Sequence, residues 1–170
     1  MQRFGTLGKT GKFSTDQFDI ASLDDEIRVD HLCESLLRLY YRFQVEESGA
    51  RPEVAGANAR GADYLLREFI IGDRRENLFR IDPKRIRQFA GNWYIAKSLE
   101  PNRGELQTIL QGTAGLYAFL SGFGLYPAVQ TAEIEQYCRD LDYYQRRIDD
   151  FWAIENDGFD AWCAACPVEP

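Results

Sequence analysis

The sequence predicts an all-α protein, a single-domain bundle of about five helices that follows a flexible N-terminal arm. Apolar side chains recur three and four residues apart along several segments, which is the spacing of one helix face. No segment shows the apolar-polar alternation of β-branched residues that is typical of half-buried strands. The 170 residues are 45% hydrophobic, enough for one well-filled core. We expect residues 1–20 to form the arm and residues 21–170 to form the helical domain.

The first predicted helix begins after Ser22 and ends near Glu47. Residues 22–25, Ser-Leu-Asp-Asp, resemble a capping box, in which the first side chain and the last satisfy free amides at a helix start. One buried stripe is expected along this helix, formed by Val29, Leu32, Leu36, Leu39, Tyr40 and Phe43. Residues 1–18 carry scattered glycines and no such periodicity, so they are assigned to the arm.

Three further helices are delimited by turn and capping residues. A second helix follows Pro52 and stops at Gly72, and a third starts at Asp82-Pro83 and runs to about Leu99. A fourth helix follows residues 100–102 and contains Gly112 and Gly115. Because glycine costs about 1 kcal/mol against alanine inside a helix, this pair predicts close approach of a neighbouring helix.

The fifth predicted helix runs from about Ala132 to Ile154. Its expected buried stripe consists of Ile134, Tyr137, Cys138, Leu141, Tyr144, Ile148, Phe151 and Trp152. Residues 156–158, Asn-Asp-Gly, form a turn signal, and a short helical piece follows it.

Charge and composition narrow the functional classes. Residues 1–130 carry 17 basic and 17 acidic side chains, whereas residues 131–170 carry 3 and 10, so the net charge of -7 resides in the last forty residues. This acidic end argues against non-specific nucleic-acid binding. No apolar run approaches the length of a membrane span, and no secretory signal is apparent, so we expect a cytoplasmic protein without membrane contact.

One stretch of the chain is locally basic, between residues 60 and 87. Its loop and the predicted start of the third helix carry Arg74, Arg75, Arg80, Lys84 and Arg87. Exposed amides and the helix dipole favour an anion at such a place, so these residues form a candidate site for phosphate or nucleic acid. The alternative is that Asp73, Glu76 and Asp82 pair with these side chains and fix the loop.

Four cysteines form the candidate metal or redox set. Cys163 and Cys166 have the Cys-x-x-Cys spacing, and Cys138 and Cys33 could complete a zinc site. The same pair could instead be a thiol-redox site, and ordinary buried thiols remain the third alternative. We expect no cofactor, with zinc as the one alternative. His31 would serve poorly beside Cys33, since side chains two residues apart on a helix point in nearly opposite directions.

Part of the fourth helix and its exit resemble a known DNA-associated domain. The segments are Glu105–Leu110 and Leu116–Leu120, followed by Gly-Leu-Tyr-Pro at residues 124–127. Over residues 105–127 this pattern is similar to the helical N-terminal core-binding domain of tyrosine recombinases. The resemblance implies DNA-associated helical packing without strand cleavage, because no arginine-histidine-arginine-tyrosine catalytic domain is expected in this chain.

These observations favour a binding role over catalysis. His31 is the only histidine and lies between Asp30 and Leu32 on the first helix, so no catalytic constellation is evident. We therefore expect a non-catalytic helical binding or regulatory module, with a protein or nucleic acid as partner and a transcription- or recombination-related role. The alternative is a metal-binding or thiol-redox protein that uses Cys163 and Cys166. Self-association of the amphipathic helices is a further expectation.

Overall fold

The structure is a computed structural model that describes residues 14–170, and this range contains helices and no strand. A short turn of 3-10 helix, η1 (Thr15–Phe18), precedes seven continuous helices. Their bounds are α1 (Leu23–Glu46), α2 (Pro52–Asp63) continued by η2 (Tyr64–Ile71), α3 (Lys84–Gln88) continued by η3 (Phe89–Trp93) and α4 (Tyr94–Lys97), α5 (Arg103–Gly122), α6 (Ala128–Arg139), α7 (Leu141–Trp152) and α8 (Phe159–Ala165). The all-α prediction is confirmed.

The start of α1 is the capping box that the sequence predicts. The Ser22 hydroxyl accepts the amide N–H of Asp25 at 3.1 Å, and the Asp25 carboxylate accepts the Ser22 N–H at 3.0 Å. Two amides that the helix itself leaves unsatisfied are thereby paired. The predicted stripe faces inward, with Val29, Leu36 and Tyr40 buried.

The prediction of about five helices is too low, because the expected fifth helix is broken at Asp140. The backbone of this residue leaves the helical region at φ -79° and ψ 47°, which separates α6 from α7. The guanidinium of Arg87 holds the Asp140 carboxylate at 2.8 Å, and the Tyr144 hydroxyl donates to the Tyr137 carbonyl at 2.7 Å across the break. Together with α8, this break accounts for the higher count.

The boundary expected at residue 20 is also corrected. The side chain of Phe18 is fully buried and meets Phe79 edge-on, with ring centroids 4.8 Å apart. Asn77 donates to the Thr15 carbonyl at 2.8 Å, which ties η1 to the loop before α3. Residues 14–20 therefore belong to the folded domain. The rest of the predicted arm, residues 1–13, lies outside the described residues.

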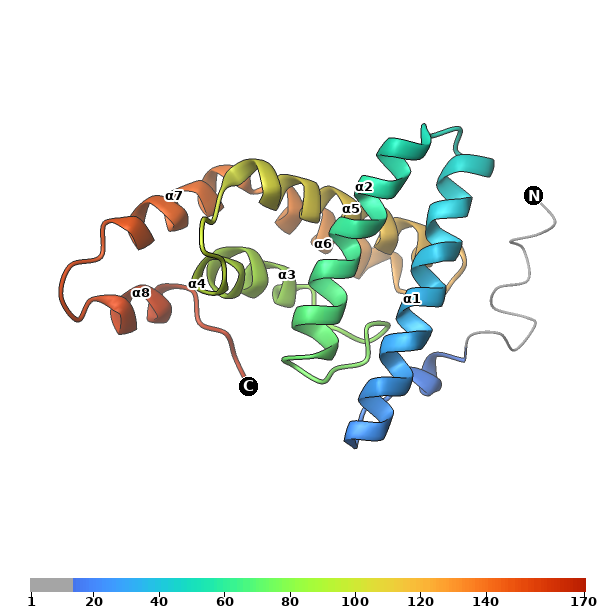
Figure 1. Ribbon diagram of the computed structural model, residues 1–170, viewed down its shortest axis with the longest axis horizontal. Helices are drawn as coiled ribbons and strands as arrows, with labels where there is room; N and C mark the ends of the chain where they lie inside the picture. Colours follow the sequence, from blue (N-terminus) through green and yellow to red (C-terminus); the bar gives the residue numbers. More distant parts are fainter. Residues whose placement is uncertain (1–13) are drawn as a thin grey trace.

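The centre of the fold is the crossing of α2 and α5 (Figure 1). A Cβ at Gly112 would lie 2.1 Å from the carbonyl oxygen of Asn58, and one at Gly61 would lie 2.6 Å from that of Thr108. Only glycine permits backbones to approach this closely. The close approach that the glycines of the fourth predicted helix indicate is confirmed at Gly112, and the Tyr40 hydroxyl donates to the Gly112 carbonyl at 3.2 Å.

Two helices continue through wider, π-helical turns that pack against each other through aromatic rings. Phe69 of η2 meets Phe89 at 5.5 Å and Trp93 at 5.3 Å between ring centroids. Phe89 and Trp93, both in η3, are stacked 5.8 Å apart. These rings join the second and third predicted helices into one core.

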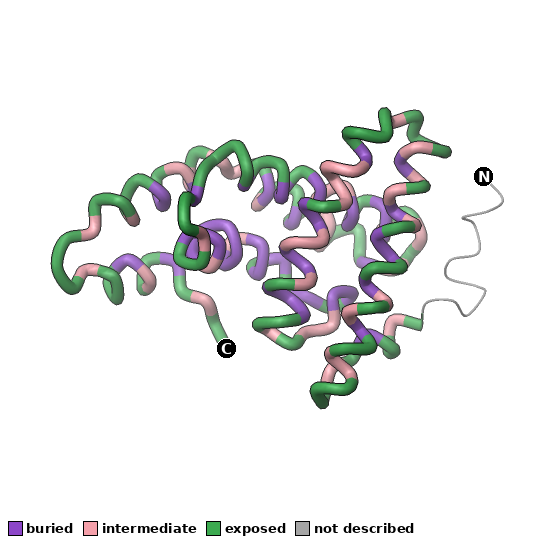
Figure 2. Tube along the Cα trace, in the orientation of Figure 1, coloured by how far each residue is buried: buried purple, intermediate pink, exposed green. Residues whose placement is uncertain are grey.

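Burial is concentrated in the middle of the molecule, and the α7–α8 hairpin extends away from it (Figure 2). In Figure 1 this hairpin lies at the end of the molecule opposite the α1–α2 pair. Within residues 14–170, no helix combines the length and the apolar character that a membrane span requires.

Candidate functional site

The basic residues of the predicted anion site contact other parts of the chain. Arg74 pairs with Asp73 at 2.9 Å and donates to the Glu169 carbonyl at 2.9 Å. Arg75 places two guanidinium nitrogens 2.9 and 3.0 Å from one carboxylate oxygen of Glu26. This part of the predicted site therefore ties its loop to α1 and to the C-terminal tail.

Of the other three residues of the predicted site, two pair with carboxylates in different parts of the chain and the third is exposed. Arg80 pairs with Asp19 at 2.9 Å and also with Asp16. Arg87 binds Asp140 at 2.8 Å and lies 4.3 Å from the centre of the Tyr143 ring. Lys84 is exposed, with no ion-pair partner among residues 14–170.

Four of the five side chains thus stabilise loops and junctions. These contacts favour the alternative in which acidic neighbours fix the loop, although the pairing carboxylates are mostly more distant in sequence than expected. Binding of phosphate or nucleic acid at these residues stays a prediction.

Sequence reasoning missed the basic residue with the most contacts in this region. The Arg85 side chain is 8% exposed and pairs with the Glu76 carboxylate, with its Nε 3.1 Å from one oxygen. It also donates to the Gln88 side chain at 2.6 Å, to the Glu169 carbonyl at 2.7 Å and to a Pro170 oxygen at 3.2 Å. Arg85 therefore anchors the C-terminal tail. The sequence signal that could have identified Arg85 is its position between the apolar residues Ile81 and Ile86.

The four cysteines of the predicted metal site are free thiols in three separate parts of the fold. Cys33 lies in α1, Cys138 in α6, and Cys163 and Cys166 at the end of α8. The Cys166 thiol points at the Arg87 carbonyl, 3.7 Å away, and lies against Gly91. Over the part of the chain described, no group of three or more potential ligands is placed to hold a metal ion. Zinc binding stays a prediction that this arrangement does not favour.

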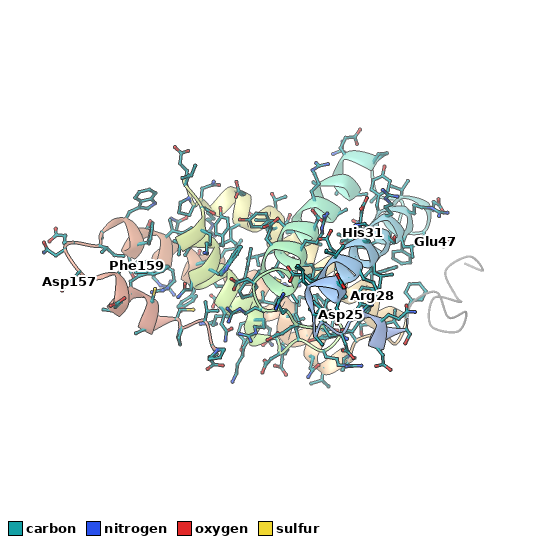
Figure 3. All side chains as sticks on the ribbon, turned by 60° about the horizontal axis from the view of Figure 1, so that its bottom comes forward. Asp25, Arg28, His31, Glu47, Asp157 and Phe159 are labelled. Carbon is teal, nitrogen blue, oxygen red and sulfur yellow. The ribbon has the colours of Figure 1, made fainter. Side chains whose placement is uncertain are left out.

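Burial makes two of these thiols poor nucleophiles. It raises the pKa of Cys138 to about 12, and it raises the pKa of Cys33 strongly as well. Desolvation disfavours the charged thiolate, which is the reactive form. Cys163 is only half-buried and is the most accessible thiol. The single histidine, His31, lies on the exposed face of α1 (Figure 3).

The α7–α8 hairpin is held together by a buried arginine. Arg147 donates to the Gly91 carbonyl at 2.8 Å and to the Trp162 carbonyl at 2.7 Å, and its guanidinium lies 4.1 Å from the centre of the Trp162 ring. The Trp162 indole returns a hydrogen bond to the Arg147 carbonyl at 3.0 Å. This arginine therefore links α7, α8 and η3, so the hairpin is a built part of the fold.

The tip of this hairpin exposes two aromatic side chains among carboxylates. Trp152 is 61% exposed and Phe159 is 44% exposed. Exposed carboxylates surround them in sequence, at Asp149, Asp150, Glu155, Asp157 and Asp160, and none of the five forms an ion pair with another described residue. Figure 3 shows Asp157 and Phe159 at the end of the molecule remote from Glu47. We call residues 149–160 the acidic hairpin tip.

The expectation that Trp152 is buried is wrong, and the reason lies in the packing of its neighbour Phe151. Phe151 takes the inward position and packs on Trp162 with ring centroids 5.2 Å apart, which turns Trp152 outward. Adjacent residues on a helix point about 100° apart, so Trp152 does not share the inward direction of Phe151. The sequence signal that could have identified the tip is the run of acids on both sides of residues 151 and 152.

Comparison of the chain with known protein families, curated proteins and solved structures yields no match. The segment that resembles the recombinase core-binding domain forms α5 and the turn that leads to α6. This resemblance stays an expectation.

Proposed function

We propose that this protein is a helical binding module that recruits a partner protein through the acidic hairpin tip. The role as a binding or regulatory module follows the expectation from sequence, while the surface differs from the arginine region. The partner that fits this surface is a protein with a basic face that also offers an apolar recess.

The observation that carries the proposal is the exposure of Trp152 and Phe159 on a rigidly anchored hairpin. Exposed apolar patches with a polar rim mark interaction sites, and tryptophan is enriched among the residues that dominate binding energies. Exposing a large ring to water is unfavourable, so burial against a partner would stabilise the complex by about 1.5–3 kcal/mol per ring.

Charge defines the chemistry of the partner. Residues 141–165 carry six carboxylates and two arginines, a net charge of -4, and one of these arginines is the buried Arg147. Such a surface attracts basic proteins and repels phosphate backbones. For this reason a protein partner is favoured over the nucleic acid that the sequence left open.

Affinity capture with matched variants tests this proposal. The full chain, immobilised, is compared with a Trp152→Ser/Phe159→Ser variant and with a Leu99→Ser/Val129→Ser variant, whose two apolar residues are also exposed, at 96% and 75%. We expect a cell extract to yield a protein that the wild type and the Leu99/Val129 control both retain and the Trp152/Phe159 variant loses.

Salt distinguishes the electrostatic part of the contact. Retention should weaken as ionic strength rises from 50 to about 300 mM, since exposed charges are screened over about 10 Å at 0.1 M. Equal retention by all three proteins, or loss in the Leu99/Val129 control alone, would refute the assignment of this surface.

A further inference from the structure

Cys163 and Cys166 lie where the end of α8 is attached to η3. The side-chain amide of Asn92, a buried residue of η3, donates to the Cys166 carbonyl at 2.8 Å and to the Cys163 carbonyl at 3.5 Å. The Cys166 sulfur lies 3.7 Å from the Arg87 carbonyl oxygen, and a Cβ at Gly91 would lie 2.9 Å from it. The Cys166 thiol therefore fills a tight place in the packing of α8 on η3.

The backbone places these two cysteines within reach of a disulfide. The Cys166 N–H donates to the Cys163 carbonyl at 3.2 Å, which closes a turn over three residues at the end of α8. The Cα atoms at the two ends of such a turn lie less than about 7 Å apart, and most disulfides span about 4.4–6.8 Å between Cα atoms. Side chains three residues apart also share one face of a helix. A bond between the two sulfurs is therefore compatible with this turn.

The two thiols differ in access in the way that thiol-disulfide exchange requires. Cys163 is half-buried, whereas Cys166 is 5% exposed. Exchange begins when an accessible thiolate attacks an external disulfide, and a second thiol of the protein then completes the bond. Burial raises the pKa of both Cys33 and Cys138, so neither of these thiols competes with Cys163.

We propose that Cys163 and Cys166 form a reversible disulfide by exchange with a small disulfide such as oxidised glutathione, and that this bond loosens α8 from η3. The Cys163 thiolate attacks one glutathione sulfur, forms a mixed disulfide and releases one glutathione thiolate. The Cys166 thiolate then attacks the Cys163 sulfur and releases the second. Each cysteine thiol gives up one proton to a departing glutathione thiolate. The cysteine pair is thereby oxidised by two electrons, and oxidised glutathione is reduced to two thiols.

The disulfide displaces the Cys166 sulfur from its place beside Gly91. One sulfur already fills this space, so a second sulfur cannot be bonded to it there and the Cys166 side chain has to turn outward. The hydrogen bond from Asn92 to the Cys166 carbonyl is the attachment nearest to this change. The same helix carries Phe159 of the acidic hairpin tip, so the bond would regulate docking there. This regulatory step rests on the proposed function, whereas the disulfide itself does not.

Peptide mass analysis of the native full chain tests the disulfide. The protein is incubated with oxidised glutathione, quenched in acid, denatured, treated with iodoacetamide and digested with trypsin. Residues 148–170 contain no lysine or arginine, so both cysteines appear in one peptide. We expect this peptide to lose two hydrogen atoms and to resist alkylation, while the peptides that contain Cys33 and Cys138 are alkylated. Reduced glutathione should restore both thiols.

Serine variants separate the two thiols. In Cys166→Ser, the Cys163 thiol should stop at the glutathione adduct, and in Cys163→Ser the buried Cys166 should remain a free thiol. Hydrogen-deuterium exchange then measures the loosening, with oxidant-treated Cys166→Ser as the matched control. Amides of residues 159–166 should exchange about tenfold faster in the oxidised wild type, while those of α1 should be unchanged.

Each readout has a result that contradicts the proposal. A peptide 148–170 that stays alkylated, or stops at the glutathione adduct, would exclude the disulfide. Equal exchange of α8 in the oxidised and reduced chains would exclude the loosening. If both forms retain a partner that the Trp152→Ser/Phe159→Ser variant loses, the regulation of the tip is wrong and the proposed function stands. If no form retains a partner, the proposed function fails while the mass and exchange results still decide the switch.

Discussion

Replacing Gly112 with alanine tests the crossing on which the fold is built. The new Cβ would lie 2.1 Å from the Asn58 carbonyl oxygen and 2.9 Å from its carbon, well inside van der Waals contact. Both atoms belong to the α2 backbone, so relief requires the helix to move. Overpacking of this kind costs about 1–3 kcal/mol or more, while alanine returns about 1 kcal/mol of helix propensity. Because the overlap is severe, we expect a net loss of about 2 kcal/mol.

Urea unfolding followed by circular dichroism measures this loss. The expected change corresponds to a melting temperature lower by about 4–8 °C for a protein of this size. Gly122→Ala is the matched control on the same helix, since no atom lies within 4 Å of its Cβ position, and it should be neutral or stabilising by up to about 1 kcal/mol. A Gly112→Ala variant at least as stable as the wild type would refute the close crossing of α2 and α5.

Contacts elsewhere in the chain lead to four further predictions. Ser22→Ala should lower the free energy of unfolding by about 1 kcal/mol in urea titrations. The pKa of Asp25, the capping partner of Ser22, is held at about 2, chiefly because its carboxylate accepts a backbone N–H. The stabilisation that this carboxylate contributes is therefore present above the unfolded pKa and is lost as pH falls from about 4 to 2. Asp25→Asn should therefore be less stable than the wild type at pH 7 and no less stable at pH 2. In a thiol-reagent assay of the native protein, Cys163 should react first, and Cys138 should react only on unfolding, because burial raises its pKa to about 12. Arg147→Met should cost about 2–4 kcal/mol, since two carbonyls lose their donor, and should speed amide exchange in α8 relative to α1.

Local signals sufficed for most helix bounds. The first helix was predicted from Ser22 to about Glu47 and spans Leu23–Glu46, because its capping box and stripe act within one element. The break at Asp140 escaped prediction, since the apolar period continues through it. What sets the break is a contact with Arg87, which lies 53 residues earlier.

The candidate sites were harder to predict, because charge counts do not show pairing. Arg74, Arg75, Arg80 and Arg87 form a basic cluster in sequence, and the fold gives each a contact in another part of the chain. The acidic excess near the C-terminus was evident, but the outward turn of Trp152 depends on Phe151 packing against Trp162.

Hydroxyl-radical footprinting most directly tests the central claim that the acidic hairpin tip is a docking surface. Oxidation of Trp152 and Phe159 is compared between the purified chain and the same chain in cell extract, with exposed Leu99 and Val129 as internal references. The account predicts protection of the two aromatic side chains in extract and unchanged oxidation of the references. Equal oxidation at all four positions in both samples would contradict it.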